Sequence, residues 1–364
     1  MSETILKEEE KIAFALRALY QKYGYLSYKM SKFEEYDLYV ENKDFLVGDG
    51  VITFNDTNGK LLALKPDVTL SIIKNDADNG GKRKVCYNEN VYRISETTGH
   101  FKEIMQTGLE CIGDIDLYDE FETVYLAAKS LDAISKKFVL DISHLGIVSA
   151  VLKRMDLGEK FSKTAMQKIA EKNLHELDAL CEKYGVKESD KNTLKQIVST
   201  YGTPETVLKK LNEVCAFSEE KEALSQLENL WQLLKTTEYA DNIRMDFSVV
   251  NDMNYYDDIV FKGFVSGIGE GVLSGGRYDK LLSKMGRRSG GIGFAVYLDL
   301  LENFGLKKRA TDVDVLVLYD DSTEIKTLIS KVATLVKEGK SVSAQKTKTA
   351  VRFIELCDLT GGKK

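Results

Sequence analysis

The sequence lacks features that would mark a membrane or secreted protein. No apolar run approaches the roughly 20 residues that a bilayer-spanning helix needs. The first 24 residues, MSETILKEEEKIAFALRALYQKYG, carry acidic residues where a secretory signal carries basic ones. These absences predict a cytoplasmic protein without a membrane partner.

Metal ligands and paired thiols are also scarce. No CxxC pair occurs, and the number of cysteines is odd, so the sequence predicts reduced, buried thiols rather than disulfides or a zinc cluster. The five cysteines are Cys86, Cys111, Cys181, Cys215 and Cys357. The three histidines are not at metal-ligand spacing. We therefore expect no metal and no cofactor.

Nucleotide-binding and nucleic-acid-binding signatures are absent as well. The glycine-rich stretch GIGEGVLSGGRYD has no GK[ST] after it, and its spacing is not that of a phosphate loop. We interpret it as a close backbone approach within a tight sheet. The formal net charge is −6 and no dense Lys/Arg block occurs, so a nucleic-acid partner is not expected.

What is present is a mixed pattern of helices and short strands over 364 residues. Apolar residues at helical spacing predict helices at 3–23 and 120–135, and two strand-like runs at 51–54 and 60–64 predict a hairpin. Strands are expected at 84–94, 103–113 and 138–143. Strands joined in succession by short turns favour an α+β fold with an antiparallel sheet flanked by helices.

The chain is expected to contain four segments. Residues 1–144 and 238–310 form the two parts of a core, and residues 145–237 form an all-helical insertion between them. Residues 311–364 form a small α/β module, which is short for an independent core.

The strand beginning near Glu103 carries polar groups on one face. The two-residue period places Gln106, Gly108 and Glu110 together, with Gln106 and Glu110 roughly 13 Å apart and room for a small polar molecule between them. Arg93, on the preceding strand, can point into the same space and bind a carboxylate or phosphate. From the pattern alone, an exposed sheet face with solvated charges remains the alternative.

Two loops carry further candidates. In LKPDVT, Asp67 and Thr69 follow a strand that ends at a proline, although an ordinary helix N-cap would look the same. In NDMNYYDD, Tyr255 and Tyr256 offer hydroxyl groups at the end of apolar rings, although hairpin packing would also explain them.

Five stretches together resemble the catalytic domain of class II histidyl-tRNA synthetases, over roughly residues 5–305. They are LKPDVT, VYRISETTGHFKEIMQTGLECIG, NYYDDIVF, GGRYDKLL and GGIGFAVYLDLL. The resemblance implies that Asp67, Thr69 and Gln106 receive the ammonium group of histidine. It also implies that Glu110 and Tyr256 hold the imidazole, that Tyr255 lines the same pocket, and that Arg93 faces the carboxylate of the ligand.

The chain departs from that family where ATP is bound. Residues Asn251 to Asn254 replace a catalytic arginine and the residues after it, and Leu300 replaces an ATP-clamping arginine. A further phosphate-binding arginine position holds His100. Fixed cations stabilise the charge that develops on phosphates, so the loss of these arginines predicts that the histidine pocket is kept and adenylate chemistry is lost.

This combination resembles the ATP phosphoribosyltransferase regulatory subunits, a family of synthetase-like proteins. The resemblance implies a non-catalytic protein that binds free histidine and that activates and feedback-regulates a short-form catalytic subunit. It also implies a dimer within a hetero-oligomer, by family a hetero-octamer, and a cut-down anticodon-binding module at the C-terminal end. The alternatives are an active or degenerate histidyl-tRNA synthetase and an RNA sensor built on the same fold.

Overall fold

The structure is a computed structural model, and it divides the chain into two units, Met1–Phe304 and Gly305–Lys364. It describes residues 6–42, 46, 50–75, 81–94, 98–249, 255–301, 304, 311–348 and 350–361. Within these ranges, no helix combines the length and the apolar character needed to cross a membrane.

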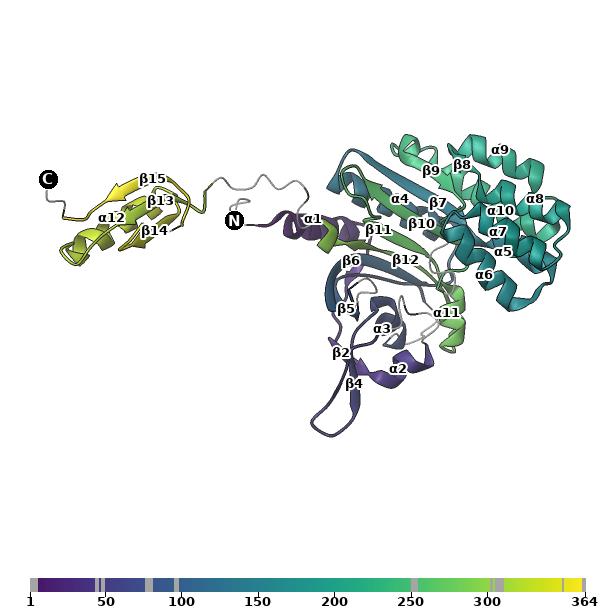
Figure 1. Ribbon diagram of the computed structural model, residues 1–364, viewed down its shortest axis with the longest axis horizontal. Coiled ribbons are helices and arrows are strands. Elements are labelled where there is room, and N and C mark those ends of the chain that lie inside the picture. Colours follow the sequence, from purple (N-terminus) through teal and green to yellow (C-terminus); the bar gives the residue numbers. More distant parts are fainter. Residues whose placement is uncertain are drawn as a thin grey trace. The chain divides into compact units, whose positions relative to one another are not determined.

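A nine-stranded sheet forms the centre of the first unit (Figure 1). Six of its eight neighbouring strand pairs are antiparallel, and the β1–β5 and β7–β9 pairs are parallel. In spatial order the strands are β1 (Leu26–Ser27), β5 (Arg83–Ile94), β6 (Phe101–Gly113), β12 (Gly290–Tyr297), β11 (Leu273–Arg277), β10 (Ile259–Val265), β7 (Phe138–His144), β9 (Ile243–Asp246) and β8 (Tyr201–Gly202). The predicted α+β class, with an antiparallel sheet flanked by helices, is confirmed.

Two long helices cover one face of this sheet. Helix α1 (Glu8–Lys22) packs against α4 (Leu117–Ile134), and α4 packs against β10 and β12. Between the helices the buried Tyr20 hydroxyl lies 2.9 Å from Ser130 Oγ, and the Tyr20 ring meets Phe294 edge-on at 5.8 Å. A large hydrophobic core therefore lies between the sheet and these helices.

Helix α4 begins earlier than the predicted residue 120. The side chain of Asp116 accepts hydrogen bonds from the amides of Tyr118 and Asp119, and Asp119 accepts one from the Asp116 amide at 2.9 Å. This reciprocal cap satisfies free amide groups of the first turn, so the helix starts at Leu117.

The other face carries a small three-stranded sheet with short helices. Its strands are β2 (Phe33–Glu35), β4 (Leu61–Leu64) and β3 (Thr53–Asn55), and the helices are α2 (Tyr36–Glu41), α3 (Val68–Lys74) and α11 (Asp279–Lys284). The predicted hairpin is confirmed, since β3 and β4 pair antiparallel and the Asp56 amide donates to Lys60 O at 2.8 Å. Ile72, Val91 and Leu281 belong to the second core beneath it.

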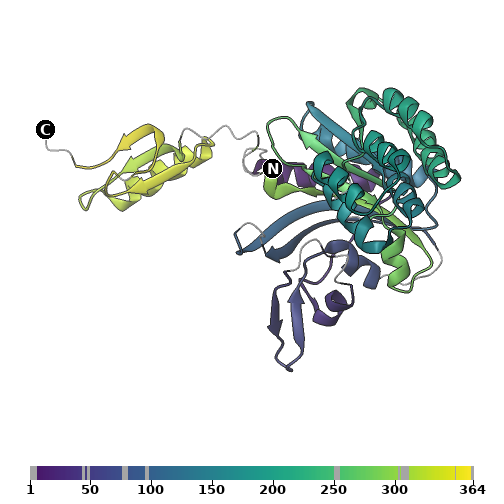
Figure 2. The same cartoon turned by 45° about the vertical axis from the view of Figure 1, so that its right-hand side comes forward.

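Six α-helices lie in sequence between β7 and β9, and Figure 2 shows them as a teal group at the end of the sheet where these two strands lie. They are α5 (Leu145–Met155), α6 (Gly158–Ala170), α7 (Leu174–Lys183), α8 (Glu188–Val198), α9 (Pro204–Val214) and α10 (Ser218–Leu234). The prediction that residues 145–237 are all helical is wrong at β8, where Tyr201 and Gly202 pair with β9. Without β8, β9 would present unpaired amide and carbonyl groups on that side, and the chain between α8 and α9 satisfies them. The side chains of these helices belong to the same core as the sheet.

Over its described residues, the second unit is a small parallel sheet with one helix. Strands β14 (Val342–Gln345), β13 (Val313–Leu318) and β15 (Phe353–Asp358) lie side by side in that order, and the helix is α12 (Ile325–Lys337). Val315, Val317 and Leu335 form its buried core.

Glycines in β11 and β12 allow large side chains to lie directly on the sheet. A Cβ atom at Gly293 would collide with the carboxylate of Glu110, its register partner on β6. A Cβ at Gly276 would lie 2.7 Å from Tyr256 Cδ1. In the glycine-rich stretch, a Cβ at Gly275 or Gly276 would also lie 2.5 or 2.6 Å from a backbone carbonyl oxygen, so the interpretation as a close backbone approach is confirmed at these two glycines but not at Gly269, where a Cβ would meet no atom within 4 Å.

Gly293→Ala is expected to lower the free energy of unfolding by about 1–3 kcal/mol, because the added methyl overpacks a buried site. Gly269→Ala is the control, since a Cβ there meets no atom within 4 Å, and its effect should stay within about 0.5 kcal/mol. Urea denaturation of both variants measures the difference. Equal losses would contradict this account of the glycines.

Candidate functional site

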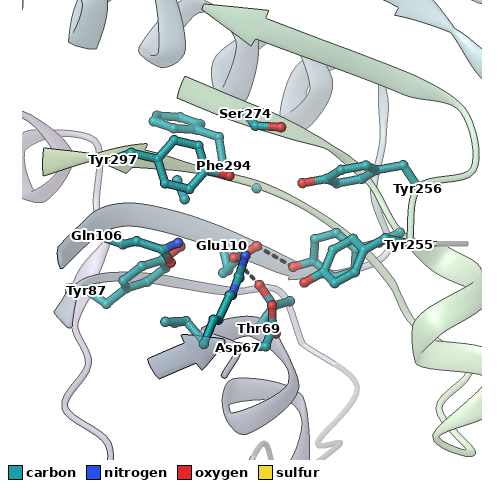
Figure 3. Close-up of a pocket in the computed structure, with 15 residues that line it drawn as sticks. Asp67, Thr69, Tyr87, Gln106, Glu110, Tyr255, Tyr256, Ser274, Phe294 and Tyr297 are labelled. Carbon is teal, nitrogen blue, oxygen red and sulfur yellow. Dashed lines mark hydrogen bonds between the residues drawn. The ribbon is translucent and has the colours of Figure 1, made fainter. Parts of the chain in front are cut away.

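One cavity of the first unit opens on the face of the sheet that carries α3. Its volume is about 480 Å³ when the open solvent at its mouth is included, and its inner part is narrow. Figure 3 shows polar and aromatic side chains converging on it from β5, β6, β11, β12 and α3. The structure brings the seven residues predicted to bind histidine to this one cavity: Asp67, Thr69, Arg93, Gln106, Glu110, Tyr255 and Tyr256.

Glu110 is the most deeply buried acid in the cavity, with 2% of its surface exposed. One carboxyl oxygen accepts a hydrogen bond from Thr69 Oγ1 at 2.7 Å, and the other accepts one from the Tyr278 hydroxyl at 2.6 Å. No cation is among its contacts within the described residues. Burial raises the pKa of Glu110 to about 8, although the two hydroxyl groups oppose the shift. A carboxyl group in this environment is protonated for much of the time at neutral pH.

Asp67 is a second buried acid at the same site. Its carboxylate caps α3 by accepting a hydrogen bond from the Leu70 amide at 2.8 Å, so the N-cap interpretation of LKPDVT is correct. Its side chain also lines the cavity. Burial raises the pKa of Asp67, and the nearby Arg93 works against that shift. The cap therefore fixes an acid beside Thr69 and Glu110.

Arg93 and Gln106 complete the polar lining. Arg93 Nε donates a hydrogen bond to the Pro66 carbonyl at 2.9 Å, which ties β5 to the loop that carries Asp67. Gln106 is buried, with 4% of its surface exposed. The alternative of an exposed sheet face with solvated charges is wrong, since Gln106 and Glu110 are both buried.

The expected space between Gln106 and Glu110 is already occupied. Tyr87 lies opposite Gly108 in the β5–β6 register, and a Cβ at Gly108 would lie 2.6 Å from the Tyr87 hydroxyl oxygen. The Tyr87 side chain therefore fills the gap that the glycine leaves. The prediction of ligand space directly above Gly108 is wrong, because it considered one strand without its neighbour.

Several aromatic side chains of the cavity were not predicted. Tyr87, Phe294 and Tyr297 line it together with Tyr278, which directly contacts Glu110. The Tyr255 ring lies 4.9 Å from Tyr256 and 5.9 Å from Tyr278, measured between ring centres. The two-residue period of Ser274, Gly276 and Tyr278 was the signal in the sequence that could have placed Tyr278 on this face.

Two of the residues that replace expected ATP-binding arginines can be located. Leu300 follows β12 in a short 3-10 helix, Leu298–Leu301, and lines a second cavity that shares Ser274 and Tyr297 with the first. His100 is exposed in the turn between β5 and β6. Asn251 to Asn254 lie outside the described residues. Among the described residues, no group of three or more His, Cys, Asp or Glu side chains could hold a metal ion.

Comparison with known proteins gives the family. The family model described as histidyl-tRNA synthetase matches residues 2–301, which is most of the chain. The chain therefore belongs to the histidyl-tRNA synthetase family.

Curated relatives narrow the comparison. A protein of Oceanobacillus iheyensis is 28% identical over 91% of this chain and 83% of its own length. A protein of Caldanaerobacter subterraneus subsp. tengcongensis is 29% identical over 90% of this chain and 87% of its own. Both are named ATP phosphoribosyltransferase regulatory subunit. The predicted resemblance to these subunits is confirmed, and the prediction of a regulatory rather than a catalytic protein agrees with both names.

Solved structures show the same fold. A protein of Bacillus halodurans C, described as an ATP phosphoribosyltransferase regulatory subunit/histidyl-tRNA synthetase, matches with a TM-score of 0.80 and 23% identity over 97% of this chain and 94% of its own. A chain of the ATP phosphoribosyl transferase (HisG:HisZ) complex from Thermotoga maritima matches with a TM-score of 0.62 and 17% identity, over 79% of this chain and 96% of its own. At these identities the likeness establishes the fold.

The raised pKa of Glu110 predicts how stability depends on pH. The folded state holds the proton up to about pH 8, whereas an unfolded glutamate loses it near pH 4.3. The contribution of Glu110 to stability is therefore present below the unfolded pKa and is lost as pH rises toward 8. Relative to wild type, Glu110→Gln should gain up to about 1.4 kcal/mol per pH unit between pH 5 and 8. Urea denaturation at four pH values measures this difference, and a constant difference would show that Glu110 is ionised throughout.

Proposed function

We propose that this protein is a histidine-binding regulatory subunit of ATP phosphoribosyltransferase. In this proposal it activates a short-form catalytic subunit and mediates its feedback regulation in the first step of histidine biosynthesis. The observation that carries the proposal is the buried pair of acids, Asp67 and Glu110, in a cavity lined by tyrosines. The proposed ligand is free histidine.

The hydrogen-bonding groups of imidazole suit the side chains at the inner end of the cavity. A neutral imidazole has one N–H donor and one acceptor nitrogen, and a carboxyl group together with a phenol can bind both. Glu110 supplies the carboxyl group, and Tyr256 and Tyr278 offer phenols beside it. Because Thr69 and Tyr278 already fix both oxygens of Glu110, little side-chain ordering is needed when the ring binds.

The amino-acid end of histidine suits the remaining polar groups. Asp67, Thr69 and Gln106 present oxygen atoms that can accept hydrogen bonds from an ammonium group. Arg93 offers a guanidinium group to the carboxylate. In this orientation the ammonium group compensates the charge of a buried acid, which would otherwise be costly to ionise.

The residues around the cavity do not support adenylate formation from ATP. Adenylate formation needs fixed cations beside the phosphates, and removing one such group typically costs on the order of 10²- to 10³-fold in rate. Leu300, at the second cavity, cannot supply the fork of an arginine. The proposal therefore assigns binding to this protein and catalysis to its partner.

The names of the relatives support the proposed partner. Both curated relatives are named regulatory subunits, and one structural neighbour comes from a two-component transferase complex. We propose a dimer within a hetero-oligomer, in the cytoplasm, with the hetero-octamer as the expected assembly. Histidine regulates this assembly by binding one of its states more tightly than another, because a ligand shifts an equilibrium only by its differential affinity.

Calorimetry of the isolated protein is expected to show histidine binding at or below millimolar concentration. Glu110→Ala should weaken binding at least tenfold, since it removes the imidazole partner, and should abolish feedback inhibition of the mixed complex. Glu103→Ala is the control, because Glu103 lies on the same strand but is exposed. The proposal fails if wild-type protein binds no histidine and Glu110→Ala leaves feedback unchanged.

Histidine-dependent exchange of pyrophosphate into ATP distinguishes the synthetase alternative. We expect no exchange above background at saturating histidine and ATP, because the phosphate-binding arginines are replaced. Exchange at the rate of an ordinary synthetase would support that alternative instead.

A further inference from the structure

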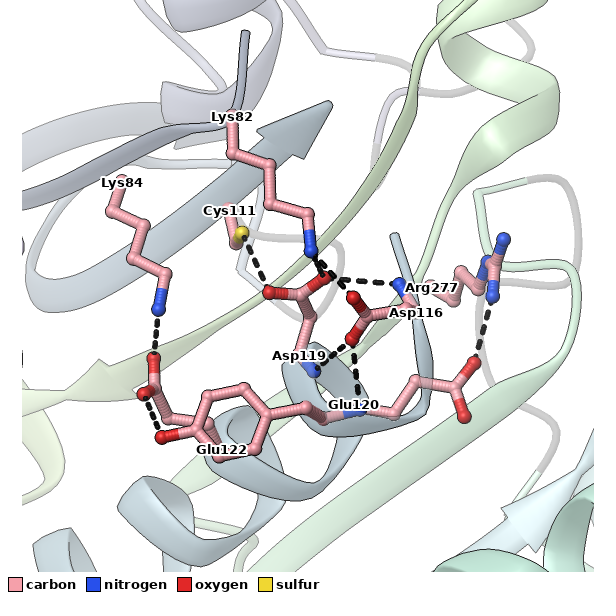
Figure 4. Close-up of polar contacts among 9 residues, drawn as sticks. Lys82, Lys84, Cys111, Asp116, Asp119, Glu120, Glu122 and Arg277 are labelled. Carbon is pink, nitrogen blue, oxygen red and sulfur yellow. Dashed lines mark hydrogen bonds and ion pairs between the residues drawn. The ribbon is translucent and has the colours of Figure 1, made fainter. Parts of the chain in front are cut away.

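Arg277 lies on the opposite side of the sheet from the cavity, one residue before Tyr278. Successive side chains of a strand point to opposite faces, so Arg277 points toward α4 while Tyr278 points toward Glu110. Arg277 Nη1 lies 2.7 Å from Glu120 Oε1 on α4. Figure 4 shows this ion pair beside the other contacts of the first turns of α4.

Both chain neighbours of Tyr278 belong to one network. Arg277 donates from Nε and Nη2 to Asp279 Oδ2 at 2.9 and 2.8 Å. The other oxygen of Asp279 accepts a hydrogen bond from the Gly291 amide at 3.0 Å, and the Tyr278 amide donates to the Gly291 carbonyl at 2.8 Å. The backbone of Tyr278 is thus fixed from both sides against β12.

The ring of Tyr278 has little freedom once its backbone is fixed. A Cβ at Gly291 would lie 2.8 Å from Tyr278 Cζ, so the ring packs directly on that glycine. The Tyr278 side chain is 1% exposed, and its hydroxyl reaches Glu110. A shift of the backbone at Arg277 would therefore move the hydroxyl that orients the Glu110 carboxyl group.

We propose that Arg277 is a positioning residue for the cavity: its ion pairs with Glu120 and Asp279 hold the Tyr278 phenol on Glu110 and so set the affinity for the ligand. The inference rests on the proposed binding of histidine. It assigns Arg277 a role at the site although its side chain faces α4.

Another ion pair on the same helix provides a matched control. Lys84, on β5, pairs with Glu122 of α4 at 2.5 Å, and the two side chains are 23% and 5% exposed. The corresponding values for Arg277 and Glu120 are 21% and 10%. The chain neighbours of Lys84 do not line the cavity. The two pairs therefore hold the same helix in similar environments. Val85, beside Lys84, is the register partner of Glu110 but does not line the cavity, whereas Tyr278, beside Arg277, bonds to the Glu110 carboxyl group.

The test compares histidine affinity by calorimetry and melting temperature in Arg277→Met and Lys84→Met. Both substitutions should lower the melting temperature, because each leaves a buried carboxylate without its cation. Arg277→Met should weaken histidine binding about tenfold, the effect of one misplaced hydrogen bond, and Lys84→Met less than twofold. Glu120→Gln keeps a neutral acceptor and serves if Arg277→Met does not fold.

A double mutant separates positioning from general destabilisation. In the Tyr278→Phe background, which lacks the hydroxyl, Arg277→Met should cause no further loss of affinity. If it still weakens binding tenfold, or if Arg277→Met and Lys84→Met have equal affinities, the inference is overturned while histidine binding stands. If wild-type protein binds no histidine, this inference fails together with the histidine binding on which it rests.

Discussion

The buried carboxyl group of Glu110 is the interaction on which the site depends. Three segments that are distant in the sequence meet at its two oxygens. Strand β6 carries the acid, helix α3 supplies Thr69, and Tyr278 comes directly after β11. A fourth segment, β12, makes room for the group by having a glycine at position 293. The hydroxyl groups bond to the oxygens of Glu110 without supplying a positive charge, so the carboxyl group remains a hydrogen-bonding partner for a basic ligand.

This arrangement has an energetic cost. Burying Asp67 and Glu110 close together raises the pKa of both, which means that the folded protein disfavours their charged forms. A ligand with a basic ring and an ammonium group would relieve that cost, and a neutral apolar ligand would not. Under the proposed function, this burial would favour histidine over similarly shaped apolar amino acids, because only histidine brings a basic ring to the buried acids.

Much of this architecture was predictable from the sequence. The two-residue period placed Gln106 and Glu110 on one face, and the hairpin at 51–64 had clear turn residues between its strands. Asp67, Tyr255 and Tyr256 were candidates from two polar loops without a periodic pattern, and the family resemblance gave them their expected roles. The cavity is lined by all five of these candidate residues: Asp67, Gln106, Glu110, Tyr255 and Tyr256.

The errors share a physical cause. The occupant of the space above Gly108 is Tyr87, which is set by the register between two strands, and a single strand does not reveal its register. Strand β8 forms because a strand more than 40 residues away needs a partner at its edge. The Tyr278 hydroxyl contacts Glu110, which lies on β6, a strand distant in the sequence. The local pattern in GGRYD does not specify this partner.

A crystal structure with bound histidine tests the central claim most directly. The account predicts an imidazole nitrogen within hydrogen-bonding distance of the Glu110 carboxyl group, and the ammonium group beside Asp67, with Thr69 and Tyr278 still bonded to Glu110. Histidine bound away from Glu110, or a cavity that stays empty at saturating histidine, would contradict it.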